Sequence, residues 1–319
     1  MKRVAPKRST RSLVEAAFLA ALTVVFCLAT IYLPILGLFT GFFWPIPIVL
    51  LGVRHDLRLS ILATVVAGII VAILAGPLTA ISMFLGLGVL GLVLGTAMRR
   101  RLTPLRVVGL GAIALLISLL LLFALSLFVM GINPLESYFG IYQDSLETTM
   151  NLYRRLGISG DALKQMEAML SQSMSMMRYL LPMAMVAGSV ILAVVNFLLS
   201  RSILARLGIA YPGFPPFAGW RLPRTAAVGY LAGIVFVLAA NYTAHEILKH
   251  IGLNIQAIFQ LALLIQGLAV AWHFMETYQL PKGLKVLVAV LTFITPLFGQ
   301  ALFFVGLFDI FFDFRRLSS

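Results

Sequence analysis

Long apolar runs separated by short polar stretches make up most of this 319-residue sequence. Many of them hold about 18 or more residues with almost no charge, which lets a helix cross roughly 30 Å of hydrocarbon. The runs are apolar on every side, unlike the alternating strands of a barrel. The pattern predicts an all-α polytopic membrane protein with about eight to ten transmembrane helices. The expected spans are 12–33, 38–53, 57–75, 78–98, 104–131, 179–205, 225–248 and 255–278, with a last apolar segment at 284–312.

Two stretches do not fit simple spans. The connection 132–178 has nearly balanced charge and lacks the apolar density of a span. We expect two amphipathic helices there, broken at Gly157 and Gly160, on the outer side of the membrane. A single helix over 284–312 would be about 43 Å long, which exceeds the bilayer core. Pro296 is expected to kink this segment into one tilted crossing or to divide it into a hairpin, and both alternatives stay open.

A proline-rich loop separates the sixth and seventh expected spans. Its sequence, YPGFPPFAGWRLPR (211–224), contains four prolines, which cannot continue a helix. Trp220 suits the headgroup layer, and Arg221 and Arg224 suit anionic lipid; a docking site for a partner protein is the alternative. The expected organisation is a basic N-terminus (1–10), a six-helix bundle (11–207), this linker (208–224), C-terminal transmembrane helices (225–312) and a tail (313–319).

Charge is scarce and unevenly placed. Only 11% of the residues are charged, against about a quarter in soluble domains, and 61% are hydrophobic. The net charge of +13 comes from basic residues at alternate ends of the expected spans. Under the positive-inside rule, the N-terminus and the linker are then cytoplasmic, and no nucleic-acid partner is needed to explain the charge. These residues include Lys2, Arg3, Arg54, Arg58, Arg99, Arg100, Arg101, Arg106, Arg201, Arg206, Lys282 and Lys285.

The sequence contains no recognisable catalytic, cofactor or metal motif. The single cysteine, Cys27, excludes an internal disulfide and a cysteine-rich metal site. The glycines of 86–91 match a dinucleotide-binding pattern by letter but follow no strand, so with Gly95 they predict helix packing. His245 and His250 are five residues apart, not four as in a zinc-protease helix. There is no P-loop either, so we expect no ATP hydrolysis, no cofactor and no metal.

The eighth expected span is unusually polar. On a helix, Gln266 and His273 lie within about 20° of each other, and Glu276 lies about 60° further round. Asn241 in the seventh span and Asn196 in the sixth are plausible partners. Polar groups inside a membrane usually face a partner or a cavity. These residues therefore form either interhelical hydrogen bonds or a site for a solute or a proton.

The first span carries two pairs of alanines four residues apart, Ala16 with Ala20 and Ala17 with Ala21. Residues at this spacing share a helix face, and small side chains there let another helix approach closely. The approaching helix belongs either to the same bundle or to a second membrane protein.

The first six spans resemble the substrate-binding membrane subunits (S components) of energy-coupling-factor vitamin transporters. The resemblance rests on RSLVEAAFLAALTVVF, on GLFTGFFWPIPIVLLGVRHD and on the glycines that follow Gly76-Pro77. It implies that the alanine face of the first helix docks a coupling subunit. It also implies a solute pocket around Tyr32, Phe43 and Trp44, for which Asn196 is a further candidate. The chain departs from S components in its 132–178 segment and its C-terminal helices.

The whole chain is similar to the YybS-like family of uncharacterised bacterial membrane proteins, through FPPFAGWRLP (214–223) and GLFDIFFDFRR (306–316). This resemblance implies a multi-pass protein of the bacterial plasma membrane and supplies no substrate. The leading hypothesis is a solute-binding or transport-related protein without its own ATPase. Its partners would be lipid, a small-molecule solute, and a coupling subunit or other membrane protein. A non-transporting scaffold or regulator of envelope or signalling proteins is the alternative, and a membrane enzyme is third.

Overall fold

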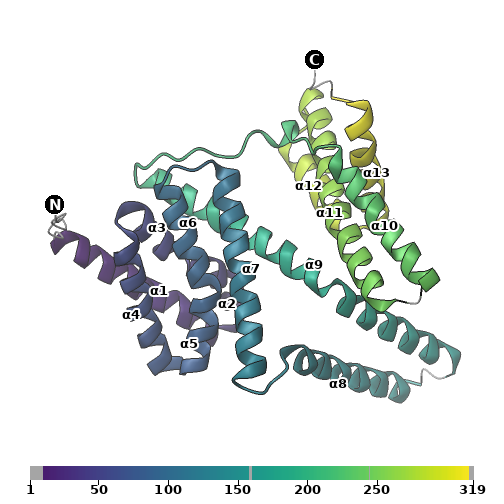
Figure 1. The fold of residues 1–319 in the computed structure, drawn as a ribbon, viewed down its shortest axis with the longest axis horizontal. Coiled ribbons are helices and arrows are strands. Elements are labelled where there is room, and N and C mark those ends of the chain that lie inside the picture. Colours follow the sequence, from purple (N-terminus) through teal and green to yellow (C-terminus); the bar gives the residue numbers. More distant parts are fainter. Residues whose placement is uncertain (1–9, 158–159, 244, 316–319) are drawn as a thin grey trace. The chain divides into compact units, whose positions relative to one another are not determined.

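The computed structural model describes residues 10–157, 160–243 and 245–315, and no strand occurs within these ranges. The expectation of an all-α polytopic protein is confirmed, because the described residues contain eight helical stretches long and apolar enough to cross a membrane, two of which combine consecutive helices. The chain divides into two compact units (Figure 1). Unit 1 comprises 1–152 and 185–213, and unit 2 comprises 153–184 and 214–319.

Unit 1 is built from the first helices of the chain. Where a span was expected at 38–53, the structure has two short helices that meet at Trp44–Pro45, since a proline removes a backbone donor from the helix. The span expected at 78–98 contains a π-helical turn at Phe84–Gly88. The elements are α1 (Thr10–Tyr32), α2 (Pro34–Phe43), α3 (Ile46–Arg54), α4 (Leu57–Ala75), α5 (Pro77–Met83), η1 (Phe84–Gly88), α6 (Val89–Arg99), α7 (Pro104–Phe128), α8 (Pro134–Arg155) and the second half of α9 (Asp161–Arg206).

Glycines allow α3 and α6 of unit 1 to pack closely against each other. A Cβ atom on Gly95 would lie 2.8 Å from the carbonyl oxygen of Val49, and one on Gly91 would lie 3.0 Å from that of Pro45. Gly52 on α3 meets the backbone of Gly95 in the same way. The interpretation of these glycines as a packing face is therefore confirmed.

The second helix of the 132–178 segment does not stop before the membrane span. The break expected at Gly157 and Gly160 is present, and both glycines have positive φ angles, of 82° and 76°. The following helix, α9, then runs without interruption for 46 residues, or about 69 Å. The helix thus begins 18 residues before the expected start of the span at 179, because the polar and apolar halves share one continuous helical backbone.

Asn254 explains how α9 accommodates a proline in its interior. Pro182 interrupts the hydrogen-bond ladder of the helix. The side chain of Asn254 accepts from the backbone N–H of Met183 at 2.8 Å and donates to the carbonyl of Tyr179 at 2.7 Å. In a regular helix the N–H of Met183 would bond the carbonyl of Tyr179, and the Asn254 amide replaces this lost bond by pairing with both groups. It also ties this part of α9 to α11 within unit 2.

Besides the first half of α9, unit 2 consists of four helices: α10 (Thr225–Thr243), α11 (Glu246–Thr277), α12 (Lys282–Ile294) and α13 (Pro296–Phe312). The break expected between 248 and 255 was placed too late, because Glu246 already belongs to the first turn of α11, where a carboxylate suits the helix dipole. The last apolar segment is divided at Thr295–Pro296, and its two helices are bent by 103°. Thr295 is extended, as the residue before a proline prefers to be.

The core of unit 2 lies where α11 crosses α10 and α13. Buried side chains at this crossing are Ala226, Ala227, Leu263, Phe303 and Ile310. The backbones of α11 and α13 approach so closely that a Cβ atom on Gly267 would overlap the carbonyl oxygen of Leu302. A Cβ atom on Gly306 would likewise overlap the carbonyl oxygen of Leu263. Only glycine fits at these two positions.

We expect Gly306→Ala to lower the thermal unfolding temperature of the purified protein, because the added methyl group has to push α11 and α13 apart. Overpacking of this kind costs about 1–3 kcal/mol or more. Gly283→Ala on α12 is the matched control, since a Cβ atom there meets nothing within 4 Å. Intrinsic tryptophan fluorescence in detergent would follow the unfolding. Equal midpoints for the two variants would contradict the close crossing.

Candidate functional site

Unit 2 contains a buried ion pair. The guanidinium of Arg315 lies 2.9 Å from Asp309 Oδ2, and the two side chains are 0% and 1% exposed. Two further buried atoms of the pair, Asp309 Oδ1 and Arg315 Nε, have no hydrogen-bond partner among the residues that the structure describes. They are a complementary acceptor and donor, so a small rotation would make the pair bidentate.

This ion pair fixes the proline-rich loop. Arg315 Nη1 donates to the carbonyl of Ala218 at 2.6 Å, and Nη2 donates to that of Trp220 at 2.8 Å. Gln266 on α11 completes the cluster. Its Nε2 donates to Asp309 Oδ2 at 2.7 Å, and its Oε1 accepts from the backbone N–H of Leu222 at 3.0 Å. Three backbone groups of the loop are thus held by two buried side chains.

Aromatic rings support the same loop from outside the cluster. Trp220 packs edge to face on Phe214 and Phe217, with ring centroids 5.8 and 5.2 Å apart. Arg221 lies 3.3 Å from Asp313, and Arg224 is exposed. The three residues expected at the membrane interface, Trp220, Arg221 and Arg224, therefore lie on or directly beside the loop that this cluster holds, and their contact with lipid stays a prediction.

The polar residues expected to act together with Gln266 have other surroundings. His273 contacts the ring of Phe274, with centroids 5.6 Å apart. Glu276 accepts a hydrogen bond from Trp272 at 3.0 Å, and Asn241 is exposed. In the structure, Gln266 pairs with Asp309 and with the backbone of the loop. The spacing of polar residues along one helix could not predict these partners.

Around the first loop, the expected solute-pocket residues are placed as follows. Trp44 is 1% exposed and packs on Phe84 of the π-helical turn, at 5.3 Å between centroids. Phe43 packs on Phe26 at 6.4 Å, and Tyr32 is exposed and donates to the carbonyl of Leu74. Aromatic packing, rather than polar groups, dominates at these positions.

Asn196 and the alanine face lie elsewhere in unit 1. Asn196 is fully buried on α9 and donates to the carbonyl of Leu192 at 3.0 Å, while its Oδ1 has no partner among the described residues. The alanine face is split. Ala16 and Ala20 are buried within the unit, whereas Ala17 and Ala21 are exposed.

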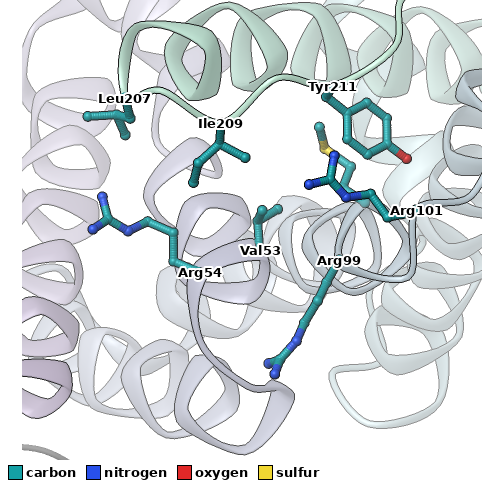
Figure 2. A pocket seen from close by; sticks show the side chains of 8 residues that line it. Val53, Arg54, Arg99, Arg101, Leu207, Ile209 and Tyr211 are labelled. Carbon is teal, nitrogen blue, oxygen red and sulfur yellow. The ribbon is translucent and has the colours of Figure 1, made fainter.

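A cavity of about 490 Å³ opens at another place in unit 1, where three helices end (Figure 2). Figure 2 shows Arg54 and Leu207 on one side and Arg101 and Tyr211 on the other, with Ile209 between them. The lining residues come from the end of α3, from the end of α6 and the turn after it, and from the segment after α9. They are Val53, Arg54, Met98, Arg99, Arg101, Leu207, Ile209 and Tyr211.

Two helix caps shape the walls of this cavity. At the end of α9, Gly208 adopts a positive φ of 78°, and the N–H of Ile209 bonds back to the carbonyl of Leu204 at 2.9 Å. At the end of α6, Arg101 takes the equivalent position with a φ of 54°. This left-handed conformation costs a side-chain-bearing residue about 1 kcal/mol relative to glycine.

The segment after α9 is fixed to the turn after α6. Arg101 donates to the carbonyl of Ala210 at 2.8 Å, and the hydroxyl of Tyr211 donates to the carbonyl of Leu102. Arg201 holds the carbonyl of Tyr211 at 2.9 Å. Burial raises the pKa of the Tyr211 phenol above its usual value, and the positive charge of Arg101 opposes this rise. The phenol therefore stays protonated at neutral pH and keeps its role as a donor.

The cavity carries an excess of positive charge. Arg54 Nε lies 2.8 Å from Glu15 Oε1, and His55 contacts the second oxygen of that carboxylate at 3.0 Å. Arg101 bonds a neutral carbonyl, and no hydrogen bond or ion pair joins Arg99 to a residue that the structure describes. Sequence reasoning recognised these arginines only as topology signals. Their positions just after two separate apolar runs were the available signal that they would meet.

The class of protein is a multi-pass helical membrane protein with a basic cavity in one unit and a buried ion pair in the other. Residues 21–310 match the family described as Predicted membrane protein (DUF2232), and the chain belongs to this family. It is also 28% identical to the Uncharacterized protein YybS of Bacillus subtilis (strain 168) over 309 residues, which cover 97% of this chain and 99% of that protein. No solved structure matches the chain.

We expect Asp309→Asn to release the proline-rich loop. The substitution leaves the buried Arg315 without a charged partner, at a cost of about 3–5 kcal/mol. Limited trypsin digestion should then cut after Arg221 or Arg224 faster than in the parent protein. Asp313→Asn is the matched control, because that carboxylate takes part in a more exposed pair worth about 0–1 kcal/mol. Similar cleavage rates for the two variants would show that the buried pair does not hold the loop.

Proposed function

We propose that this protein binds a small solute in unit 1 and takes part in its transport without an ATPase of its own. The observation that carries the proposal is the cavity of about 490 Å³ between the ends of α3, α6 and α9. Its volume falls within the range of roughly 300–1,000 Å³ that is usual for small-molecule sites. Its lining combines aliphatic walls with arginines and a tyrosine, a mixture that can both enclose and orient a ligand.

The absence of a P-loop from the sequence fits a protein that relies on a partner or an ion gradient for energy. In this proposal the basic ends of the helices face the cytoplasm, as the positive-inside rule favours. The cavity would then open on the cytoplasmic side of a bacterial plasma membrane, and the C-terminal unit would supply a rigid aromatic loop at the interface.

A panel of soluble metabolites should contain at least one compound that raises the thermal unfolding temperature of the purified full-length chain. A ligand at about 100 times its Kd stabilises the native state by about 2.7 kcal/mol. Val53→Trp, which fills part of the cavity, should abolish the shift. Val65→Trp on the exposed side of α4 is the control and should retain it. A panel without any stabilising compound would refute the proposal.

The second candidate function is a non-transporting scaffold for envelope or signalling proteins. The observation that favours it is the dry aromatic packing of Trp44 and Phe84, where the resemblance to S components implies a polar solute pocket. In this case the exposed Ala17 and Ala21 would receive a helix of a second membrane protein.

Under the scaffold hypothesis, the protein extracted in mild detergent retains a partner at fixed stoichiometry. Ala21→Leu should release that partner, because the larger side chain keeps the helices apart, whereas Val25→Leu on the same exposed side should not. Native mass spectrometry would measure the ratio. Recovery of the chain alone would exclude the scaffold function.

A further inference from the structure

We propose that the cavity of unit 1 is a binding site for a phosphate-bearing anion. This inference rests on the proposed solute-binding function, because it names the class of ligand for the same cavity. Arg54 lines the cavity from the end of α3, and Arg99 and Arg101 line it from the end of α6 and the turn directly after it, about 45 residues further along the chain. Figure 2 shows Arg54 and Arg101 on opposite sides of Ile209, while the Arg99 side chain extends away from both. Guanidinium groups bind phosphate oxygens through charge-assisted, often bidentate hydrogen bonds, and rotation of these long side chains would bring them to a phosphate in the cavity.

Most N–H donors of these arginines remain free for a ligand. A guanidinium has five N–H groups. Arg54 gives one nitrogen to Glu15, and Arg101 gives one to the carbonyl of Ala210. Arg99 gives none to any residue that the structure describes, and its side chain is exposed. The cavity therefore combines a positive charge excess with donors that have no acceptor within residues 10–157, 160–243 and 245–315.

Neutralisation of helix dipoles does not account for all of this charge. The three helices that end here each present a carboxyl end, which is equivalent to about half a negative charge. The guanidinium of Arg99 or of Arg54 could offset such an end. Arg101, however, lies beyond the last turn of α6 and in a left-handed conformation that glycine adopts more easily. An arginine at this position places a full positive charge at the mouth of the cavity.

The rest of the lining indicates which kinds of molecule could bear the phosphate. Val53, Met98, Leu207 and Ile209 form an aliphatic wall beside the arginines. Such an amphipathic lining, at the basic end of membrane helices, accommodates the headgroup phosphate and glycerol of an anionic lipid. It also accommodates a soluble phosphate monoester. The shared chemistry is the phosphate, and the experiment has to separate the two sources.

The experiment measures the thermal unfolding temperature of the full-length chain in neutral detergent with three probes. These are phosphatidylglycerol, zwitterionic phosphatidylcholine and glycerol phosphate. Phosphatidylglycerol or glycerol phosphate should raise the midpoint, and phosphatidylcholine should not. Titration should give an apparent affinity that weakens with added salt, because the contact is ionic.

The variants Arg99→Gln and Arg101→Gln should each weaken that affinity on the order of tenfold, since each removes a charge-assisted bond. Arg106→Gln is the matched control, because Arg106 lies in the first turn of α7, outside the cavity lining, and its loss changes the net charge equally. Arg101→Gly gives a second control for folding, as it relaxes the backbone while it removes the guanidinium. Weakening by Arg106→Gln equal to that by Arg99→Gln would overturn the site.

The outcomes separate the two proposals. Stabilisation by glycerol phosphate that depends on Arg99 and Arg101 supports both the anion site and a soluble substrate. Stabilisation by phosphatidylglycerol alone supports the anion site and refutes solute binding at this cavity. Stabilisation by a neutral metabolite, with no response to either anion, overturns the anion site and leaves solute binding in place. No response to any compound overturns both.

Discussion

A buried arginine has to be neutralised and hydrogen-bonded, and this constraint organises unit 2. Arg315 is almost at the end of the chain, yet its side chain is fully enclosed and its partners lie on α13 and on the proline-rich loop. Removing either charge would leave the other unpaired in a low-dielectric interior. Arg315 therefore cannot leave the bundle without a large cost, and the loop cannot separate from Arg315. The two stretches that suggested the family from sequence, FPPFAGWRLP and GLFDIFFDFRR, contact each other through this pair.

The two polar centres of the molecule differ in how far their hydrogen bonds are satisfied. In unit 2, the side chains of Gln266, Asp309 and Arg315 hydrogen-bond one another and three backbone groups of the loop, and they enclose no cavity that the structure describes. In unit 1, Arg99 and Arg101 retain most of their donors and border a cavity. A satisfied cluster fixes a conformation, whereas a cluster with spare donors can bind a ligand. This difference, more than the charge itself, is the reason why a binding role is proposed for the cavity of unit 1 and not for the ion pair of unit 2.

The resemblance to S components depends on features that several helical bundles could share. Glycine and alanine faces at a spacing of four residues arise wherever helices pack closely in a membrane. The glycines of α6 meet α3 within the unit, and half of the alanine face of α1 is buried in the same way. The positions around Tyr32, Phe43 and Trp44 are mainly aromatic, and the basic cavity lies at the ends of α3, α6 and α9 instead. A solute-binding function for this chain is therefore best tested at the cavity.

The sequence by itself determined the helical class, most of the spans and the packing role of Gly91 and Gly95, because bilayer thickness and close helix approach impose patterns that are local along the chain. It did not determine the continuity of α9, since Pro182 is accommodated by Asn254, more than seventy residues away in the chain. Only the tertiary structure joined Gln266 to Asp309 and gathered Arg54, Arg99 and Arg101 at one cavity. Such clusters are formed by helix ends and loops that are distant in sequence. Periodicity within one helix reports the direction of a side chain and carries no information about which helix it meets.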